Sequence, residues 1–286
     1  MNSYEAIQQS ILNEMANGIV PWHKPYTGPE GALNYVSRRP YSLLNQMLLP
    51  KKGEFLTPKQ AAQLGGDFAG QRTSTIYFFK MYEKGTKTYD EDGNEIKEEV
   101  PVLKSYNVLH VSQVKGLESK YTAPEGERNL REDDIEAAVK AFCEKNGVTV
   151  VHDPSASPSY SPETDTVTIP SIRQYESSGA YYNDLLRCLA HATGTAERLG
   201  RGVESRIGID GYGREELVAE MTSAMLLNHF EADTLDVWRN SVAYIKHWMD
   251  SIAEDKYMIV WAAGRAEKAA KMILEGSETA TAAAAA

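Results

Sequence analysis

The sequence lacks the features that place a protein in a membrane or in an oxidising compartment. Its 286 residues contain no apolar run of bilayer-spanning length and no basic-then-apolar segment at the N-terminus. The only cysteines are Cys143 and Cys188, too few for a disulfide framework. We therefore expect a cytoplasmic protein without membrane contact, long enough for two domains that each bury a core.

Positive charge is also scarce, but it is unevenly distributed. The net charge is −10, yet residues 1–120 hold 14 basic and 13 acidic side chains, a net charge of +1. Residues 121–286 hold 16 and 27, a net charge of −11. Within the first part, residues 90–99 alone carry six acids and one lysine. Only the N-terminal part therefore has a charge balance that could attract a polyanion over its surface.

The periodicity of apolar residues and the positions of turn residues divide the chain into two α+β domains. Residues 3–18 have the pattern of an amphipathic helix that ends at Asn17-Gly18. Two strand-like segments on either side of Asp92-Gly93 predict an antiparallel hairpin. We place an N-terminal domain with a small antiparallel sheet at 1–118, a linker at 119–131, a C-terminal domain at 132–275 and a disordered tail at 276–286.

One helical segment, DLLRCLAHATGTAERLGR, raises the question of a metal site. In an H-E-x-x-H helix, two histidines four residues apart bind zinc from one face, and the glutamate activates the metal-bound water. Here His191 fills the last position, whereas Arg187 and Cys188 stand in the places of the first histidine and the glutamate. Taken alone, one histidine on a helix is more often a structural or surface residue than a ligand.

The segments around this helix resemble a known family. The order YSPETDTVTIP, YYNDLLRCLAHATGTAERLGR and GREELVAEMTSAMLLNHF resembles the C-terminal zincin-like metallopeptidase domain of the ArdC-type antirestriction proteins of plasmids and phages. NGIVPWHKPY, NYVSRRPYSLLN, FLTPKQAAQLGG and LKSYNVLHVSQVKGL resemble successive blocks of the family's N-terminal domain, which binds single-stranded DNA. The resemblance covers about residues 4–275 and implies two α+β domains, the second zincin-like with helices following short strands.

The resemblance also indicates what remains of the metal site. In the family, the positions of Arg187 and Cys188 supply one ligand and the general base; the remaining candidate ligands are His191 and Glu216, with Glu220 one turn further on. Arginine has no lone pair to offer a metal ion, and an unactivated thiol is mostly protonated at neutral pH. A catalytic zinc needs three protein ligands. We therefore expect no catalytic residue, no cofactor and an inactive domain; zinc is expected only if the metal site survives.

A buried carboxylate that has lost its metal needs another cation. We expect Arg187 to supply that charge by pairing with Glu216 or Glu220. Two alternatives stay open. Cys188 and His191 are three residues apart and with Glu216 could form a Cys/His/Glu metal site of an active metallopeptidase. The acidic C-terminal half could instead make the chain a binding module for a restriction protein or a host protein.

The N-terminal half offers candidates for contact with single-stranded DNA, which proteins hold with aromatic platforms for bases and cations for phosphates. We expect six residues of two segments to contact DNA: Trp22, Lys24, Arg38, Arg39, Tyr41 and Asn45. A core position is the alternative interpretation of Trp22 and Tyr41. A loop that is rich in lysine in the family holds only Arg72 here, which predicts modest affinity without sequence preference. The leading hypothesis is an antirestriction-like protein of a mobile element that binds single-stranded DNA and carries an inactive zincin-like domain.

Overall fold

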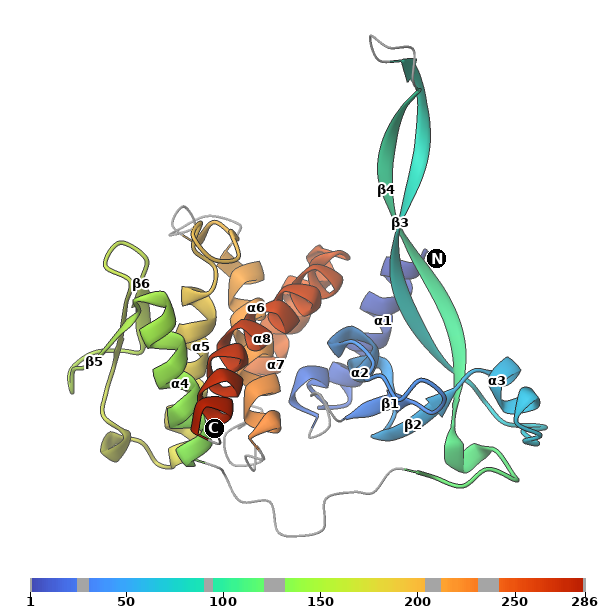
Figure 1. Cartoon of the computed structure of the whole chain (residues 1–286), viewed down its shortest axis with the longest axis horizontal. Coiled ribbons are helices and arrows are strands. Elements are labelled where there is room, and N and C mark those ends of the chain that lie inside the picture. The colour runs from blue at the N-terminus through green and yellow to red at the C-terminus, as the bar shows by residue number, and fades with distance from the viewer. Residues whose placement is uncertain are drawn as a thin grey trace.

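The chain folds into two α+β parts, as the sequence predicts. The computed structural model describes residues 2–24, 31–89, 95–120, 132–203, 212–230 and 242–284. In Figure 1 the N-terminal part lies on the right, with a long two-stranded arm projecting from it, and the mainly helical C-terminal part lies on the left. Within the described residues, no helix combines the length and the apolar character needed to cross a bilayer.

The N-terminal part is built on a four-stranded sheet of order β1-β2-β4-β3. Its elements are α1 (Ser3–Ala16), β1 (Ala32–Asn34), α2 (Leu43–Leu48), β2 (Gly53–Leu56), α3 (Pro58–Gln63), β3 (Ser74–Tyr89) and β4 (Glu95–His110). Strands β3 and β4 pair along their length as the antiparallel hairpin that the sequence predicts. The sheet is not wholly antiparallel, however, because β1 and β2 pair in parallel. The chain between them passes through α2, which provides the crossover that parallel neighbours require.

Helix α1 shows how local sequence sets an element in place. Asn2 caps it by accepting a hydrogen bond from the backbone N–H of Glu5 at 3.0 Å, and the Glu5 carboxylate accepts one in return from the backbone N–H of Asn2. The helix ends at Asn17, and Gly18 takes the left-handed conformation with φ of 80°. Its apolar stripe of Ile7, Ile11 and Met15 is buried, so α1 packs on the rest of the protein through one face.

The C-terminal part has short strands followed by helices. Its elements are α4 (Glu132–Asn146), β5 (Thr149–His152), β6 (Ser159–Ser161), β7 (Thr166–Ile169), α5 (Ser178–Ala192), α6 (Tyr212–His229), α7 (Val242–Glu254) and α8 (Met258–Ala284). The strands form a sheet of order β5-β7-β6. Helix α8 continues to Ala284, so the expectation of a disordered tail at 276–286 is wrong up to that residue. The tail is rich in alanine, which extends a helix that has already begun. Most of the expected linker, 121–131, lies outside the described residues.

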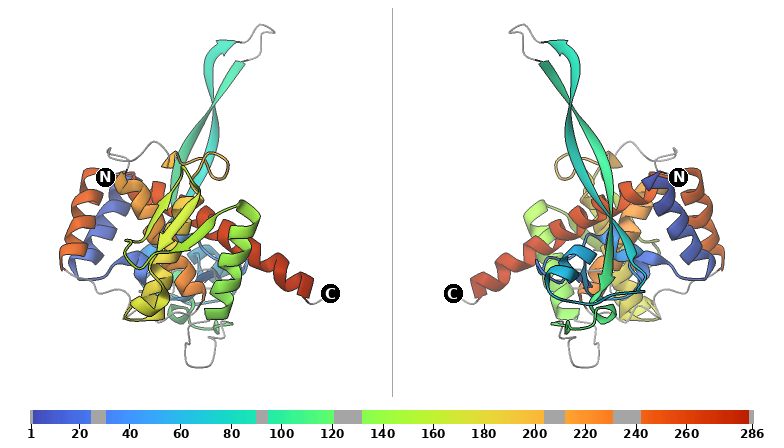
Figure 2. Two further views of the ribbon diagram at one scale, coloured as in Figure 1. Left: turned by 90° about the vertical axis from the view of Figure 1, so that its left-hand side faces the viewer. Right: turned by 90° about the vertical axis from the view of Figure 1, so that its right-hand side faces the viewer.

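One hydrophobic core joins the two parts. Residues of α1, α2 and the loop before β1 pack in a single buried cluster with residues of α6, α7 and α8. At its centre the rings of Trp22 and Trp248 meet edge to face, with centroids 6.2 Å apart. Gln8 adds a hydrogen bond from Nε2 to the carbonyl of Ile252 at 2.7 Å. The views in Figure 2 show α1 beside the C-terminal helices from both sides. The two sequence domains are therefore packed into one body.

Candidate functional site

Helices α5 and α6 bring the residues of the zinc-type motif together. Ser177 caps α5 by accepting a hydrogen bond from Ala180 N at 3.2 Å, and the helix buries an apolar face against α4, β7 and α6. This packing turns Arg187 and His191, one helical turn apart, toward α6. Helix α6 places Glu216 and Glu220 opposite them, also one turn apart.

His191 lies in a network of carboxylates. Its Nε2 is 3.2 Å from Oε1 of Glu216, and its Nδ1 is 3.6 Å from Oε1 of Glu215. Glu215 is held in turn by Arg201, whose Nη2 and Nε donate to its two oxygens at 2.7 and 3.0 Å. Burial by itself would lower the pKa of His191, but the carboxylates of Glu215 and Glu216 outweigh burial and raise it. The network therefore fixes both the position and the orientation of the imidazole.

The spacing of His191 and Glu216 is that of two ligands of one metal ion. Ligands about 2.0 Å from a tetrahedral zinc lie about 3.3 Å from each other, close to the 3.2 Å that separates Nε2 and Oε1. Glu215, behind the other ring nitrogen, stands where a carboxylate orients a metal-bound histidine. The separation of His191 and Glu216 on α5 and α6 is thus compatible with two metal ligands.

The position of the first histidine of the motif, which would supply the third ligand, holds the cation of Arg187. Nη1 of Arg187 donates to Oε1 of Glu220 at 3.0 Å, and the Glu220 side chain is only 8% exposed. This confirms the expectation that Arg187 pairs with an acid of α6 and selects Glu220 over Glu216. Burial would lower the pKa of Arg187, but Glu220, Glu216 and Asp184 raise it, so the guanidinium stays charged. A fixed positive charge and a metal dication would repel each other at this site, so the residues present do not fit a catalytic zinc.

Cys188 does not complete a metal site. Its side chain is buried in the hydrophobic cluster that α5 forms with α4, β7 and α8. Burial raises the pKa of its thiol to about 12, so it carries no thiolate at neutral pH. Among the residues that the structure describes, no group of three His, Cys, Asp or Glu side chains is arranged to hold a metal ion. The geometry thus favours Cys188 as a small core residue over the Cys/His/Glu alternative.

Comparison with known proteins agrees with this architecture in both halves. A family model of the zincin-like metallopeptidases matches residues 137–265, and a model of the N-terminal domain of anti-restriction factor ArdC matches residues 1–109. The crystal structure of metal-free antirestriction protein ArdC from plasmid R388 aligns with a TM-score of 0.73 at 25% identity, covering 98% of this chain and 99% of that one. The chain belongs to the ArdC-type proteins.

Other proteins are similar to the ArdC-type chain over most of its length. The Mn(II)-bound structure of R388 ArdC aligns with a TM-score of 0.72 at 26% identity, covering 97% of this chain and 98% of that one. A DNA primase TraC of Escherichia coli is 28% identical over 95% of the chain, and the chain spans only 27% of that primase. The uncharacterized protein y4eC of Sinorhizobium fredii (strain NBRC 101917 / NGR234) is 27% identical, with 93% of this chain and 90% of that protein covered.

Four of the six residues expected to contact DNA are buried in the ArdC-type chain, which corrects the prediction for them. Trp22 lies in the core shared by the two parts, and Tyr41 packs edge to face on Phe55. Lys24 is buried, with its Nζ 2.6 Å from Glu14 and donating to the carbonyl of Met47 at 2.7 Å. A buried ring or ammonium group cannot meet a base or a phosphate, so these residues are structural in this conformation.

Asn45, the fourth buried candidate, positions another segment. Its Nδ2 donates to the carbonyl of Tyr77 at 2.8 Å, and its Oδ1 accepts from the N–H of Tyr77 at 2.7 Å. The side chain thereby fixes strand β3 to helix α2. Arg38 and Arg39, the other two candidates, are exposed, and Arg38 forms an ion pair with the buried carboxylate of Glu54. Arg39 is thus exposed, as a residue that contacts DNA would be.

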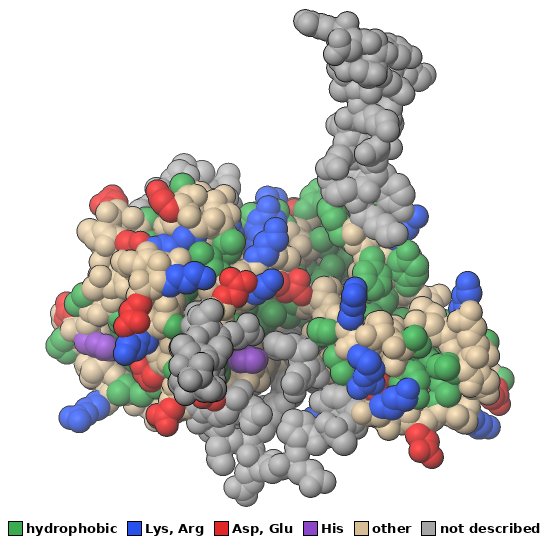
Figure 3. Space-filling view, viewed as in Figure 1, with side chains coloured by type: hydrophobic (Ala, Val, Ile, Leu, Met, Phe, Trp, Pro, Cys, Tyr) green, Lys and Arg blue, Asp and Glu red, His purple; other side chains and the backbone are tan. Residues whose placement is uncertain are grey.

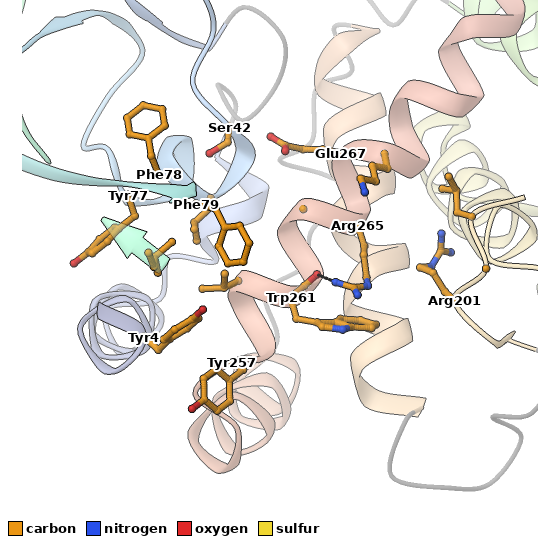
Figure 4. A pocket seen from close by; sticks show the side chains of 17 residues that line it. Tyr4, Ser42, Tyr77, Phe78, Phe79, Arg201, Tyr257, Trp261, Arg265 and Glu267 are labelled. Carbon is orange, nitrogen blue, oxygen red and sulfur yellow. Dashed lines mark hydrogen bonds between the residues drawn. The ribbon is translucent and has the colours of Figure 1, made fainter. Parts of the chain in front are cut away.

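The sequence analysis overlooked a groove between the arm and helix α8. Its volume is about 780 Å³, and it is lined by aromatic side chains of β3 and by aromatic and basic side chains of α8, with Phe79 directed toward α8 (Figure 4). Two signals in the sequence could have drawn attention to it. One is the run Tyr77-Phe78-Phe79 in a strand, and the other is the spacing of Trp261, Arg265 and Lys268 at one helical turn.

Proposed function

We propose that the chain is an antirestriction-like protein of a mobile element that binds single-stranded DNA without sequence preference, and that its zincin-like domain is not a peptidase. The observation that supports the second statement is the ion pair between Arg187 and Glu220. It puts a permanent cation where the motif would have a metal ligand. The position of the general base holds the buried thiol of Cys188, which cannot take a proton from water at neutral pH.

The metal content of the purified protein tests this part of the proposal. The protein is expressed with zinc or manganese in the medium, freed of loosely bound metal by gel filtration without chelator, and analysed by elemental mass spectrometry. We expect much less than one equivalent of either metal, and no cleavage of a general protease substrate such as casein. About one equivalent of tightly held metal would contradict the proposal.

Two observations support DNA binding. The first 109 residues match the N-terminal domain of an antirestriction factor, and relatives over nearly the whole chain bear the name of DNA primase. The acidic residues are concentrated after residue 120, which leaves the first part with a net charge of +1. This division allows the N-terminal part to approach a polyanion despite the acidity of the whole chain.

Fluorescence anisotropy with labelled oligonucleotides tests this second part. We expect saturable binding of two single strands of unrelated sequence with similar affinity, weaker binding of the corresponding duplex, and loss of affinity as salt is raised. A large preference for one sequence, or the absence of binding at low salt, would contradict it.

A restriction protein or a host protein is a second candidate partner, favoured by the net charge of −11 on residues 121–286. A basic partner surface would be attracted to this part over a distance set by the ionic strength. Co-purification of a defined restriction enzyme with the chain, at low salt and not at high salt, is the expected result. We place both activities in the cytoplasm, where incoming DNA and restriction enzymes meet.

A further inference from the structure

The groove between the arm and helix α8 has two walls of different origin. The first comes from the N-terminal part and includes Tyr77, Phe78 and Phe79 of β3. The second comes from the C-terminal part and includes Trp261, Arg265 and Lys268 of α8. In Figure 4 the ring of Phe79 points across the groove toward α8, and Trp261 lies on the opposite side. Its volume of about 780 Å³ lies within the range of about 300–1,000 Å³ usual for ligand pockets.

Three of the aromatic side chains that line this groove are exposed. Phe79 is 54% exposed, Tyr257 49% and Phe78 43%. Single exposed apolar side chains are common, but a group of them on facing elements marks a surface that another molecule covers. Figure 3 shows hydrophobic side chains gathered at the base of the arm, with basic side chains nearby. The surface is therefore both aromatic and basic.

Helix α8 presents its polar and aromatic side chains to the groove as one stripe. Trp261, Arg265 and Lys268 are four and three residues apart and so share a face. The other face is buried against α2, α4 and α6 through alanines and isoleucines. Arg265 lies over the ring of Trp261, with Cζ 4.0 Å from the ring centroid, and donates to the Trp261 carbonyl at 3.1 Å. This cation–π contact holds the indole and a positive charge side by side.

The groove also has open floor space. A Cβ added at Gly264, between Trp261 and Lys268, would meet no heavy atom within 4 Å beyond its two chain neighbours and the nearby backbone of its own helix. The carboxylate of Glu267 is partly buried and accepts a hydrogen bond from the backbone N–H of Leu43. Burial raises the pKa of Glu267, and the Leu43 hydrogen bond only partly offsets this. The one acid among the groove residues is thus directed to the protein rather than to the open space.

From this juxtaposition we infer that the groove takes the unpaired bases of single-stranded DNA, with stacking partners from both walls and phosphate contacts from Arg265 and Lys268. The inference rests on the proposed DNA binding and assigns it to a site that neither half of the chain forms alone. Exposed rings suit the faces of unstacked bases, and adjacent cations suit the phosphates between them. A duplex keeps its bases stacked and has no ring faces to offer, which favours a single strand as the occupant.

The position of the first wall depends on a residue outside the groove. Asn45 of α2 fixes the backbone of Tyr77 through two hydrogen bonds. It thereby positions the segment Tyr77-Phe78-Phe79 of β3 relative to α2. On the other side, the shared core holds α8 against α2 and α6. Both walls are therefore positioned by buried contacts, so the groove is formed before a ligand arrives.

Binding of a fluorescein-labelled oligothymidine of about 20 nucleotides tests the inference in the full chain. Lys268→Glu should weaken binding at least about fivefold, and Phe79→Ala by a similar factor or more, because one stacked base is lost. Lys271→Glu is the matched control: it lies on the same helix, outside the groove, with a side chain 77% exposed. It makes the same change of net charge and should alter affinity less than about twofold.

A variant that fills the groove tests the same inference without removing a contact. Gly264→Trp places a ring in the open floor and replaces a glycine within a helix, so it should keep or raise the thermal stability and still block the oligonucleotide. Irradiation of an oligonucleotide containing 4-thiothymidine should give adducts on peptides from both walls. If the protein binds the single strand but all groove variants bind as well as wild type, this inference is overturned and the proposed function stands. If the wild-type protein binds no single strand at low salt, both are overturned.

Discussion

The guanidinium of Arg187 and the carboxylate of Glu220 form an ion pair of 3.0 Å between α5 and α6, the two helices that carry the motif of a zinc peptidase. One turn along the same helices, His191 and Glu216 keep a separation of 3.2 Å that suits two ligands of one ion. The pair Arg187–Glu220 therefore differs from the zinc-peptidase motif, whereas the pair His191–Glu216 keeps residues that can bind a metal ion. The cation beside Glu220 is therefore part of a side chain, and Glu215 lies next to His191 with Arg201 as its own partner.

Removing the side-chain cation should destabilise the fold. Arg187→Met leaves the buried Glu220 without its guanidinium partner, and we expect a loss of about 1–3 kcal/mol, below the range for fully buried pairs because Arg187 is 31% exposed. Urea unfolding followed by circular dichroism measures the change. Adding Glu220→Leu should recover most of it, because the carboxylate is then gone. Lys140→Met, which breaks the exposed pair with Glu144, is the control and should have no measurable effect.

Restoring the motif should restore a metal site. Arg187→His together with Cys188→Glu recreates H-E-x-x-H, with His191 as its last residue and Glu216 opposite it on α6. We expect this variant to hold about one equivalent of zinc by elemental mass spectrometry. Arg187→His alone should also bind zinc, since it supplies the third ligand, whereas Cys188→Glu alone should not because the arginine remains. Failure of both well-folded histidine variants to bind zinc would show that the ligand geometry has been lost as well.

Both thiols should react slowly in the native protein. Burial raises the pKa of Cys143 to about 11 and that of Cys188 to about 12, so the thiolate fraction near neutral pH is far below that of an unfolded chain. Labelling with an aromatic disulfide reagent at about pH 8 should be at least about a hundredfold slower than in urea for both residues. Rapid native labelling of Cys188 would contradict its placement in the core of the C-terminal part.

Trp22 should contribute to stability rather than to DNA binding. It is fully buried and packs on Trp248 between the two parts of the chain. Trp22→Ala is expected to lower the free energy of unfolding by about 3–5 kcal/mol, and Trp22→Phe by less. The phenylalanine variant, once shown to be folded, should bind an oligothymidine as the wild type does. A clear loss of DNA affinity with unchanged stability would instead make Trp22 a contact for bases.

Several elements could be predicted from sequence because their signals are local. The apolar stripe and the turn at Asn17-Gly18 predicted a helix at residues 3–18. The observed bounds of α1, Ser3–Ala16, agree to within about two residues. The two strand-like segments on either side of Asp92-Gly93 predicted the hairpin of β3 and β4. The pairing of Arg187 with an acid of α6 was predicted from the family resemblance, which implies that Glu216 and Glu220 lie near Arg187, together with the need of a buried carboxylate for a partner.

Other features depended on contacts between distant segments. The sequence pattern of Trp22, Lys24, Tyr41 and Asn45 suits a DNA-binding surface as well as a core, because aromatic and polar side chains serve both. Their burial follows from the packing of α1 and α2 on α6, α7 and α8, whose residues lie up to 259 positions away in the chain (266 − 7, Ile7 and Ala266). The end of α8 was mispredicted for a different reason: low complexity was taken as disorder, although alanine favours a helix.

The sequence by itself determined the family, the two α+β parts and the loss of the first two motif residues. Each of these can be recognised from short continuous segments of the chain. Only the tertiary structure decided which acid pairs with Arg187, which aromatic residues are buried and which face solvent. It also decided that α8 and the arm face each other across a groove. The physical reason is that burial and juxtaposition depend on how helices far apart in the chain pack together, and local periodicity carries no information about which faces meet.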